Sequence, residues 1–361
     1  MIPLIVDLER EWRGGQNQAL LLLKGLYERG HAAELLAAHG SSLGHRAKKE
    51  GIYVHSVSRG QFRLPAAAKI RSLLTDGRIE LVHVNEAHAL TAAWMALPQG
   101  YPPLVVSRRV GFALRSGWLA QARYRRADAI LAISQWVADQ AVASGAPREK
   151  LRVVHEGVEI PTLPGATAKA AARKRWSLKT SDIVLGCVGV LERDKGHEWV
   201  IRALAHLGSE FPSCKLLIAG EGEYRKELTA LAAELKCKDR VIFAGFLRDV
   251  TTLYEAIDIF VFPSLFEGLG TSLLSAMSYA VPSITFFGCA LGEIVENGVS
   301  GLQVEAKNVN AIAEAAARIL REPGFGTRLA EAGRTRIKEK FSAEQMVENT
   351  LAIYERLIGR V

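Results

Sequence analysis

Short apolar runs alternate with helix-length amphipathic segments along the whole chain. In the first half the runs are PLIVD, LVHV, LVVS, AILAIS and RVVHEG, and in the second half they are DIVLGCVGV, KLLIAG, RVIFAG, DIFVFPS, PSITFF and LQVE. Nearly continuous apolar strands between helices are typical of parallel sheets that are covered on both faces. Two such series in 361 residues predict an α/β protein with two doubly wound domains.

The two series are separated by residues 160–175, which contain Pro, Gly and Ala without a strand pattern and are predicted to be a linker. Residues 342–361 are predicted to form a last helix. This helix begins with a capping box, in which Gln345 follows Ser342 by three residues. Its apolar stripe at helical spacing comprises Leu351, Ile353, Tyr354, Leu357 and Ile358.

The composition is that of a soluble globular protein, with 49% hydrophobic and 23% charged residues. No apolar run approaches the roughly 20 residues that a membrane span needs, and the apolar start MIPLIV fits a first strand better than a signal peptide. The four cysteines form no CxxC pair. Zinc binding and a disulfide framework are therefore disfavoured, and we expect a reducing, cytoplasmic location.

The net charge of +8 lies entirely in the first half of the chain. Residues 1–170 carry 22 Lys and Arg against 14 Asp and Glu, whereas residues 171–361 carry 24 of each. A basic surface can meet nucleic acid, an anionic membrane or a phosphorylated substrate, and it can also be a solvated surface with no anionic partner.

The segment GVLERDKGH follows the strand IVLGCVGV and contains the first candidate for ligand chemistry. In an open parallel sheet, ligands bind beyond the carboxyl ends of the strands. Lys195 and Gly196 occupy that position at the start of a helix, and Arg193 is a second cation in the same loop. The helix N-terminus and the ammonium group would together bind a phosphate. The alternative is that Lys195 is an ordinary exposed loop residue without a ligand.

The segment FEGLGTSLLSAM contains the second candidate. The strand IDIFVF ends at Pro263, so Glu267 belongs to the loop beyond its carboxyl end. Gly268 and Gly270 would let backbone amides approach a ligand closely. Glu267 can accept hydrogen bonds from sugar hydroxyls, and it can equally be a helix-start acid that needs no ligand.

The third candidate is the pair Gly14-Gly15, which opens a helix after the first strand and has a geometry compatible with an anion. A bare Gly-Gly is a weak signal, and no GxGxxG fingerprint follows this strand. The chain contains no DxD pair, HExxH, P-loop or GxSxG. We therefore predict neither a metal nor a cofactor, and the cations at the site have to come from Lys and Arg.

Several motifs in this order resemble the retaining GT-B glycosyltransferases of family 4, which move a sugar from a nucleotide-sugar to an acceptor. The most specific are SLFEGLGTSLLSAMSYAVPSI and GEIVENGVSGLQV, supported by VGVLERDKGH, IAGEGEYRKEL and VIFAGF. SRRVGF, RADAILAIS and RGGQNQ resemble the N-terminal half of members that act in cell-envelope polysaccharide or lipopolysaccharide assembly.

The resemblance implies two facing Rossmann-like domains with a C-terminal helix that crosses back to the first. Residues 1–164 with 342–361 would bind the acceptor, and residues 165–341 would bind the donor. The implied catalytic positions are Glu267, His88 and Asn85. The implied donor-binding residues, which hold the diphosphate, sugar and ribose, are Lys195, Arg193, Gly14, Gly15, Gly268, Leu269, Gly270, Ser275 and Glu293.

Four positions depart from the family's pattern. Ser275 stands where the family usually has an acid that holds both ribose hydroxyls, and a neutral contact there predicts roughly 5–30-fold weaker donor binding. Asn85 replaces a frequent histidine, flanked by His88 and by His83, which we interpret as a core histidine. Val190 replaces an arginine that Arg193 could substitute for. Cys289-Ala290 replaces a Gly-Gly pair near the donor sugar.

We therefore predict a metal-independent, retaining glycosyltransferase. Its partners would be a nucleotide-sugar and a glycan or lipid-linked anionic acceptor, without nucleic acid, and it would contact an anionic membrane peripherally at the inner face. Arginine forks suit phosphates, and we assign acceptor binding to Arg108 and Arg109, followed by Arg115, Arg123, Arg125 and Arg126. The alternatives are a non-catalytic sugar-nucleotide or glycan-binding relative with a degenerate site and a GT-B nucleotide-sugar epimerase.

Overall fold

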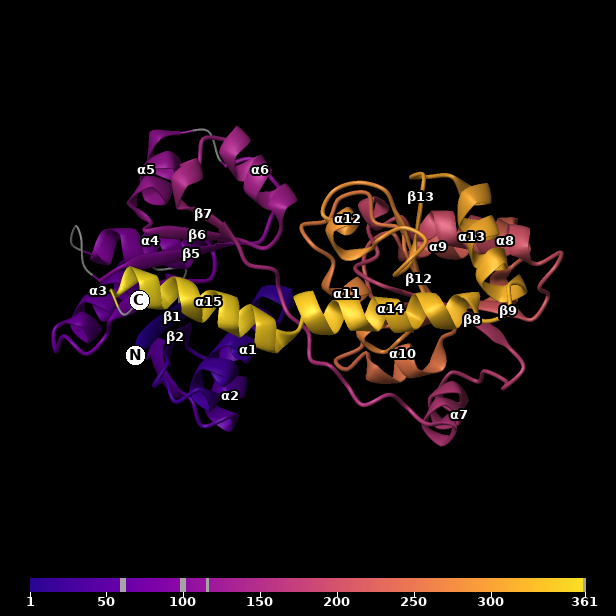
Figure 1. Cartoon of the computed structure of the whole chain (residues 1–361), viewed down its shortest axis with the longest axis horizontal. Helices are drawn as coiled ribbons and strands as arrows, with labels where there is room; N and C mark the ends of the chain where they lie inside the picture. Colours follow the sequence, from indigo (N-terminus) through magenta and orange to yellow (C-terminus); the bar gives the residue numbers. More distant parts are fainter. Residues whose placement is uncertain (59–62, 98–101, 115–116, 360–361) are drawn as a thin grey trace. The chain divides into compact units, whose positions relative to one another are not determined.

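The computed structural model describes residues 1–58, 63–97, 102–114 and 117–359. The chain divides into two compact units, coloured by sequence in Figure 1. The N-terminal unit comprises Met1–Gly157 and Ser342–Val361, and the C-terminal unit comprises Val158–Phe341. The division after Gly157 lies seven residues before the boundary at 164/165 that the sequence predicts.

The N-terminal unit contains a seven-stranded parallel sheet in the order β3-β2-β1-β4-β5-β6-β7. Its strands are β1 (Pro3–Asp7), β2 (Glu34–Ala38), β3 (Tyr53–Val57), β4 (Leu81–Val84), β5 (Leu104–Arg108), β6 (Ala129–Ala132) and β7 (Leu151–Val153). Its helices are α1 (Gly14–Glu28), α2 (Ser42–Lys49), α3 (Arg63–Leu74), α4 (Ala87–Ala96), α5 (Trp118–Arg126), α6 (Gln135–Ala143), the 3-10 turn η1 (Arg148–Lys150) and α15 (Ala343–Leu357).

Two apolar clusters cover the two faces of this sheet. One joins alternate strand residues to α3 and α4, and the other joins the intervening strand residues to α1, α2 and α15. Successive side chains of a strand point to opposite faces, so Leu4 and Ile5 enter different clusters. The sheet is therefore buried on both sides, as the continuous apolar runs predict.

Sequence reasoning missed β2 and β3, which form one side of the sheet. The sequence of β2 is ELLAA, whose Leu and Ala are strong helix formers. The edge strand β3 has the sequence YVHSV and exposes Tyr53 and Ser56, so it lacks a continuous apolar run. The residues of β2 form a strand because they pair with β1, and this pairing outweighs their local preference for a helix.

The C-terminal unit contains a six-stranded parallel sheet in the order β10-β9-β8-β11-β12-β13. Its strands, all predicted, are β8 (Ile183–Val188), β9 (Cys214–Ala219), β10 (Val241–Gly245), β11 (Ile259–Phe262), β12 (Ser283–Phe286) and β13 (Leu302–Val304). The helical elements are α7 (Ala166–Arg175), η2 (Arg193–Lys195), α8 (His197–Leu207), α9 (Arg225–Glu234), η3 (Lys238–Arg240), α10 (Thr251–Ala256), α11 (Thr271–Ser278), α12 (Leu291–Ile294), α13 (Val309–Arg321) and α14 (Phe325–Lys340).

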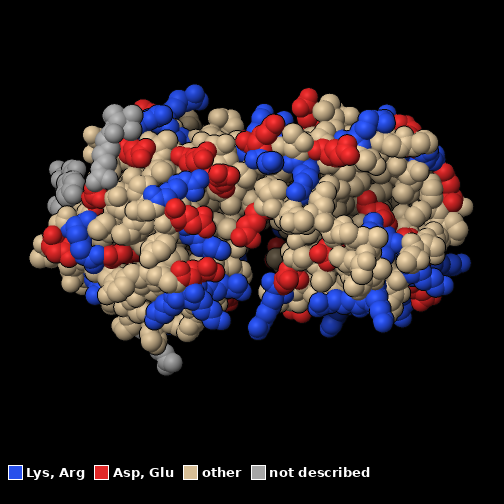
Figure 2. Space-filling view, turned by 60° about the horizontal axis from the view of Figure 1, so that its bottom comes forward, with Lys and Arg blue, Asp and Glu red and all other residues tan. Residues whose placement is uncertain are grey.

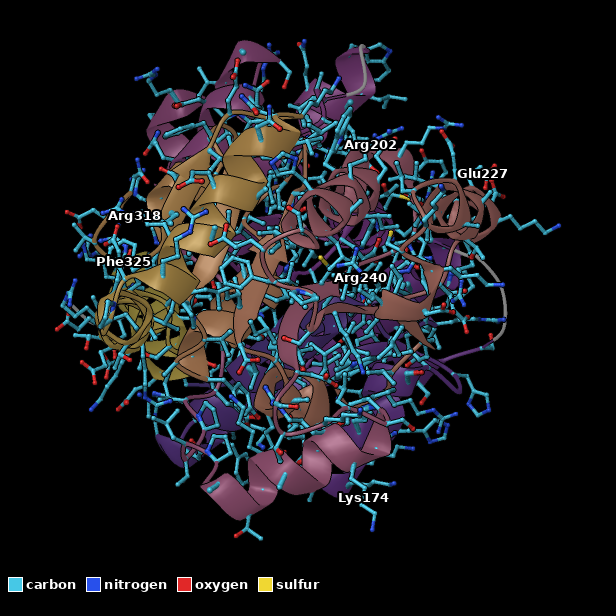
Figure 3. The ribbon with its side chains drawn as sticks, turned by 90° about the vertical axis from the view of Figure 1, so that its right-hand side faces the viewer. Lys174, Arg202, Glu227, Arg240, Arg318 and Phe325 are labelled. Atoms are coloured by element: carbon cyan, nitrogen blue, oxygen red, sulfur yellow. The ribbon has the colours of Figure 1, made fainter. Side chains whose placement is uncertain are left out.

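Charged side chains on the outer helices of this unit cover apolar residues at the edge of its core. Figure 3 labels Arg318 on α13 beside Phe325 at the start of α14, and the guanidinium carbon lies 4.3 Å from the ring centroid. Phe325 itself belongs to the main buried cluster of the unit. The arginine therefore covers the edge of the core with its stem and a cation–π contact.

The predicted linker is wrong over its second part. Residues 160–165 are irregular, but Ala166–Arg175 forms helix α7 because its sequence ATAKAAARKR is rich in alanine and long basic side chains. Arg173 on this helix is buried, and its guanidinium donates to the Asp258 carboxylate at 2.6 Å and to the Ala256 carbonyl at 3.0 Å. The helix thus belongs to the C-terminal unit.

The last helix forms as predicted, but its capping box is half formed. The Ser342 hydroxyl accepts the Gln345 backbone N–H at 3.2 Å, whereas the Gln345 side chain donates to Asn349 and does not return to the cap. Four residues of the predicted stripe are half-buried against the cluster under α1, and Tyr354 is fully buried there.

Basic and acidic residues are interspersed on the face of the N-terminal unit that Figure 2 shows. Neighbouring charges of opposite sign cancel much of each other's field over about a Debye length. The excess of basic residues in the first half of the sequence therefore forms no surface of one sign on this face.

Candidate functional site

Both sheets reverse their strand order between the first and the fourth strand of the unit. In the C-terminal unit the reversal lies between β8 and β11, and in the N-terminal unit it lies between β1 and β4. Loops diverge at such a switch point and leave a crevice beyond the carboxyl ends of the strands. Lys195 and Glu267 follow β8 and β11, and Gly14 and Asn85 follow β1 and β4.

In the C-terminal unit the switch point brings Lys195 and Glu267 together. The Lys195 ammonium lies 2.9 Å from Oε2 of Glu267, and the two side chains are 23% and 19% exposed. The Ser264 hydroxyl donates to the same oxygen at 2.9 Å. Glu267 is therefore held by both Lys195 and Ser264. The side chains of Lys195 and Glu267 remain partly exposed to solvent, as groups that bind a ligand must be.

A glycine at the start of α8 makes this approach feasible. Gly196 has φ +69°, and a Cβ atom at this position would lie 2.1 Å from the Pro263 carbonyl oxygen. The backbone after β8 therefore packs directly on the backbone after β11. The Leu265 N–H, which donates to the Asp194 carbonyl at 2.8 Å, joins the same two loops.

His197, the first residue of α8, is a candidate that sequence reasoning missed. It is 2% exposed, and among the described residues its Nδ1 has no hydrogen-bond partner. Burial and the nearby Lys195 ammonium lower the pKa of His197 to about 4, so the ring is neutral at pH 7. His197 and Lys195 line the same small cavity beside β8 and β11. In the sequence, the signal that could have identified His197 is its position directly after Lys195 and Gly196.

Glu267 is followed by the turn that begins α11. Gly270 caps the helix with φ +108°, a conformation that favours glycine, while Leu269 between the two loop glycines is buried in the core. Helix N-termini carry unpaired N–H groups and partial positive charge. The carboxylate and the amides at this turn therefore offer an acceptor and donors to one ligand.

Ser275 lies on the second turn of α11 and is half-buried. Its side chain lies beside the Tyr254 hydroxyl. The Tyr254 hydroxyl donates to the Ser272 carbonyl at 3.1 Å. The position where the resemblance expects an acid thus holds a short, neutral hydroxyl.

The loop after β8 places its other predicted residues at the surface. Val190 is 51% exposed. The Arg193 guanidinium carbon lies 4.7 Å from the ring centroid of Tyr224, whose hydroxyl donates to Glu198. Arg193 is therefore stacked on an aromatic ring and not paired with Glu267.

Beyond β12, Cys289 has φ +48°, in the left-handed region that glycine adopts easily. Its thiol donates to the Leu265 carbonyl at 3.5 Å, next to the loop that carries Glu267. Ala290 is fully buried, and Glu293 follows on the short helix α12, half-buried. The backbone at 289 thus adopts the conformation that a glycine would, although the residue differs.

In the N-terminal unit the switch point holds a buried polar network centred on Asn85. The Asn85 amide donates to the Asp7 carboxylate at 2.5 Å and to the Gly15 carbonyl at 3.2 Å, and its oxygen accepts from Arg109. Arg109 also donates to Glu156 at 2.8 Å. The amide of Asn85 thus holds the glycine pair at the start of α1 against β1 and β5.

The Asp7 carboxylate is fully buried at the centre of this network. It also accepts from the Gln16 amide at 3.0 Å, while burial raises its pKa and the Asn85 and Gln16 hydrogen bonds oppose the rise. Asp7, Gln16 and Glu156 were missed by sequence reasoning, because a single polar residue carries no signal until its partners are known.

The two histidines near Asn85 differ. His83 is buried and hydrogen-bonds to Tyr354 and, at 2.8 Å, to Ser107, and burial lowers its pKa to about 3. The interpretation of His83 as a core histidine is confirmed. His88, at the start of α4, is half-buried and lies 3.4 Å from an Arg63 nitrogen.

Within the described residues, Glu9, Glu86 and His88 place three ligand atoms within 4.8 Å of one another. The Glu86 carboxylate, however, caps α4 and accepts three backbone N–H groups, those of Leu8, His88 and Ala89. Its oxygens are engaged in the fold, and we assign no metal to this group.

Arg108 and Arg109 are both tied to neighbouring residues at the carboxyl end of β5. Arg108 donates to the Phe112 carbonyl and contacts the Tyr124 hydroxyl at 3.5 Å, and Arg109 is held by Asn85 and Glu156. Arg125 on α5 is exposed, and Arg115 lies outside the described residues. In the part of the chain that the structure describes, no helix combines the length and apolar character needed to span a membrane.

Two protein families match the chain. Residues 12–160 match the family described as Glycosyltransferase Family 4, and residues 168–336 match the family described as Glycosyl transferases group 1. Together the two matches cover most of both units.

Two curated relatives illustrate the similarity. The uncharacterized glycosyltransferase MJ1607 of Methanocaldococcus jannaschii is 29% identical over 222 residues, 59% of this chain and 57% of that protein. The lipopolysaccharide core biosynthesis mannosyltransferase LpsB of Rhizobium meliloti is 28% identical over 250 residues, 67% of this chain and 69% of that protein. The chain spans 57%, 62% and 49% of the length of three of the curated relatives that it matches.

Among solved structures, Anabaena HepE in complex with UDP and glucose matches with a TM-score of 0.82 at 20% identity, covering 97% of this chain and 98% of that one. At this identity the likeness concerns the fold. It shows the GT-B fold, with its two Rossmann-like sheets.

Proposed function

The chain belongs to the group 1 glycosyltransferases of family 4, and from this premise we propose that it transfers a sugar from a nucleotide-sugar to an acceptor. We further propose that the transfer retains the anomeric configuration, needs no metal, and uses a glycan or lipid-linked anionic acceptor.

The observation that supports this most directly is the pair Lys195–Glu267 at the switch point of the C-terminal unit. One loop presents a cation at the N-terminus of α8, and the neighbouring loop presents a carboxylate before the N-terminus of α11. A nucleotide-sugar needs both, because its diphosphate is an anion and its sugar hydroxyls are hydrogen-bond donors.

In this proposal Lys195 binds the diphosphate and stabilises the charge that grows on it as the glycosidic bond breaks. The N–H groups at the start of α8 add donors, and the neutral His197 can donate a hydrogen bond without adding a second positive charge beside Lys195. A preorganised donor of this kind typically contributes about 3–4 kcal/mol to the transition state. Lysine and amides can thus do the work that a metal does in other sites.

Glu267 would bind hydroxyl groups of the donor sugar. Ser264 holds one of its oxygens, Oε2, which leaves Oε1 for the ligand. When the donor enters, its phosphate competes for Lys195 and releases the carboxylate to the sugar. The ion pair between Lys195 and Glu267 therefore keeps both groups in place until the ligand replaces it.

The other predicted residues take different positions in the proposal. Gly14 and Gly15 stay predictions for donor binding, and Asn85, whose amide donates to the Gly15 carbonyl, would act as a positioning residue for this glycine pair. His88, Glu293 and the amides of Gly268 to Gly270 stay predictions for contacts with the sugar. Arg193 stays a prediction for the diphosphate and would have to leave the Tyr224 ring.

For the acceptor we propose an approach over α5 in the N-terminal unit. Trp118 is 74% exposed at the start of this helix, and Arg125 lies two turns later on the same side. Phe112, 64% exposed, follows β5 and its two arginines. Exposed aromatic rings beside arginines suit the interface of an anionic membrane, where a lipid-linked acceptor would be found.

The donor step is tested by incubating the protein with a panel of UDP-, GDP- and ADP-sugars and following nucleotide release, with Glu267→Ala and Lys195→Met in parallel. We expect turnover of at least one donor and a loss of roughly 10²–10³-fold in either variant. Glu331→Gln, on the surface of α14, is the matched control. Donor binding without turnover of any sugar would favour the non-catalytic relative, and conversion of the donor sugar to an epimer would favour the epimerase.

The membrane contact is tested separately, by sedimentation with vesicles of phosphatidylcholine alone or mixed with phosphatidylglycerol. We expect binding to the mixed vesicles that salt weakens and that Trp118→Ser reduces. Tyr53→Ser, which removes another exposed aromatic ring (64% exposed) from the edge strand β3, is the control. Equal sedimentation of both variants would contradict the assignment of this surface.

A further inference from the structure

The C-terminal unit has a second cavity at the amino ends of its strands. Its volume is about 470 Å³, within the range of small-molecule sites. Residues just before β11 and β12 line it, including Ile257 and Pro282. Lys195 and Glu267 lie beyond the carboxyl ends of β8 and β11, and a strand of four residues spans roughly 13 Å, so the cavity is separate from the proposed donor site.

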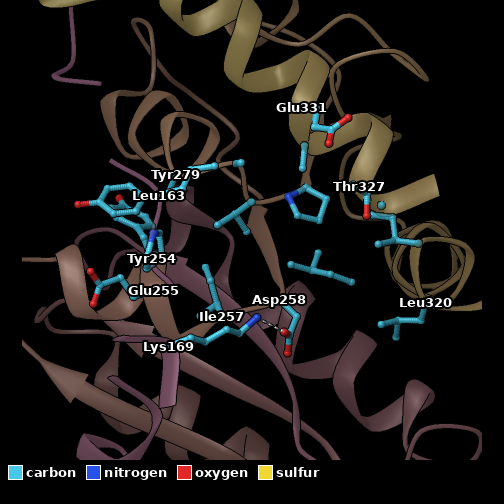
Figure 4. A pocket seen from close by; sticks show the side chains of 18 residues that line it. Leu163, Lys169, Tyr254, Glu255, Ile257, Asp258, Tyr279, Leu320, Thr327 and Glu331 are labelled. Atoms are coloured by element: carbon cyan, nitrogen blue, oxygen red, sulfur yellow. Dashed lines mark hydrogen bonds and ion pairs between the residues drawn. The ribbon is translucent and has the colours of Figure 1, made fainter. Parts of the chain in front are cut away.

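The walls of this cavity are mainly apolar and aromatic. Figure 4 shows Tyr254 and Tyr279 on one side and Leu320 and Thr327 on the other. The two tyrosine rings are stacked, with centroids 5.5 Å apart and planes inclined by 30°. Such walls suit a ligand with a ring or a compact apolar body.

The charged groups around the cavity favour a cation. Among the described residues that line it, three acids stand against one basic residue, Lys169, which lies 2.8 Å from Asp258 (Figure 4). Asp258 also accepts from Arg173 and from the Val184 N–H, so its charge is engaged in the fold. The lining also contains Glu255 and Glu331, and within the described residues neither carboxylate has a hydrogen-bond or ion-pair partner.

We propose that this cavity binds a small organic cation with an apolar ring, at a site distinct from that of the donor. The ring would lie between the tyrosines and the aliphatic wall formed by Ile257 and Leu320, and its ammonium group would be attracted by Glu255 or Glu331 and by the tyrosine faces. The site goes beyond the proposed glycosyl transfer and does not depend on it.

The cavity is also connected to α11. Tyr254 lines the cavity and donates from its hydroxyl to the Ser272 carbonyl, and Tyr279 directly follows the helix. A ligand against these rings would contact the residues that hold the helix of Ser275 in place. Binding of the ligand should therefore shift the NMR signals of Tyr254 and Tyr279 as well as those of the ligand itself.

The test uses tryptamine as the probe and indole-3-acetate as the matched compound with the same ring and the opposite charge. Binding to the full chain is measured by ligand-observed NMR titration at low ionic strength. We expect tryptamine to bind with a Kd in the low-millimolar range, as is typical for roughly a dozen heavy atoms, and indole-3-acetate to bind at least about fivefold more weakly.

Three variants locate the site. Thr327→Trp, at an exposed position on the rim, should fill the opening and abolish tryptamine binding without changing thermal unfolding. Glu331→Gln should weaken binding by about two- to fivefold, the effect of one exposed charge. Glu339→Gln, an exposed acid on the same helix outside the lining, should have no effect. Equal binding of the two indoles would overturn the preference for cations, and unchanged binding to Thr327→Trp would overturn the site.

Discussion

Gly196 offers the sharpest test of the proposed donor site, because it sets the distance between the two loops that carry Lys195 and Glu267. Replacing it with alanine has two separable effects. The backbone has φ +69°, where a Cβ atom costs about 1–2 kcal/mol. In addition, the new Cβ would lie 2.1 Å from the Pro263 carbonyl oxygen, so one loop must move by about 1 Å.

Gly298→Ala separates the two effects. Gly298 has φ +79°, but a Cβ atom there would meet nothing within 4 Å. We expect Gly298→Ala to lower the free energy of unfolding by about 1–2 kcal/mol and to leave donor turnover unchanged. Gly196→Ala should lose a further 1–3 kcal/mol or so from overpacking and about 10²-fold in kcat/KM, because misplacement by 1 Å disturbs the charge pair.

The assay is nucleotide release at several donor concentrations, with urea unfolding of the same preparations. Crystals of Gly196→Ala would show whether the distance between Lys195 and Glu267 has increased. If both alanine variants lose the same stability and neither loses turnover, the packing of Gly196 on Pro263 does not position the donor site, and the reasoning fails.

Three further predictions concern other parts of the molecule. Ser275→Glu should tighten donor binding by about 5–30-fold in a fluorescence titration, whereas Ser275→Ala, which loses the neutral contact, should weaken it by about fivefold; no gain with Glu would refute the ribose contact. Asn85→Ala leaves Asp7 and Arg109 short of partners and should lower the free energy of unfolding in urea by about 2–5 kcal/mol; a loss below about 1 kcal/mol would show that water replaces the amide. His83 has a pKa of about 3 in the folded state against 6.5 in the unfolded chain, so its stabilisation is present above pH 6.5 and is lost as the pH falls toward 3. Wild type should therefore lose about 2 kcal/mol more than His83→Gln between pH 7.5 and pH 5, and parallel pH profiles of the two would contradict the assignment.

The sequence by itself determined the fold class and most of the strands. The six strands of the C-terminal unit were all predicted, because most of them are short, mainly apolar runs between helical segments, as parallel strands covered on both faces require. The position of Lys195 and Glu267 beyond the strand ends could also be predicted from the local sequence. It follows from where the apolar run stops and where the helix pattern starts.

The tertiary structure decided which of these groups meet. Lys195 and Glu267 are 72 residues apart in the chain, and only the pairing of β8 with β11 places them 2.9 Å from each other. Strand β2 could not be predicted, because its Leu and Ala favour a helix and a long-range partner overrides that preference.

The structure also decided which polar groups are already satisfied. Asn85 looks in the sequence like a free amide for a sugar, but Asp7, Gly15 and Arg109 use its donors and its acceptor. His197, an ordinary helix residue in the sequence, becomes a buried ring beside Lys195, and its Nδ1 has no hydrogen-bond partner among the residues that the structure describes. A pattern along the chain shows which residues are buried, but a buried polar group is defined by its partners, and these come from distant strands that only the fold brings together.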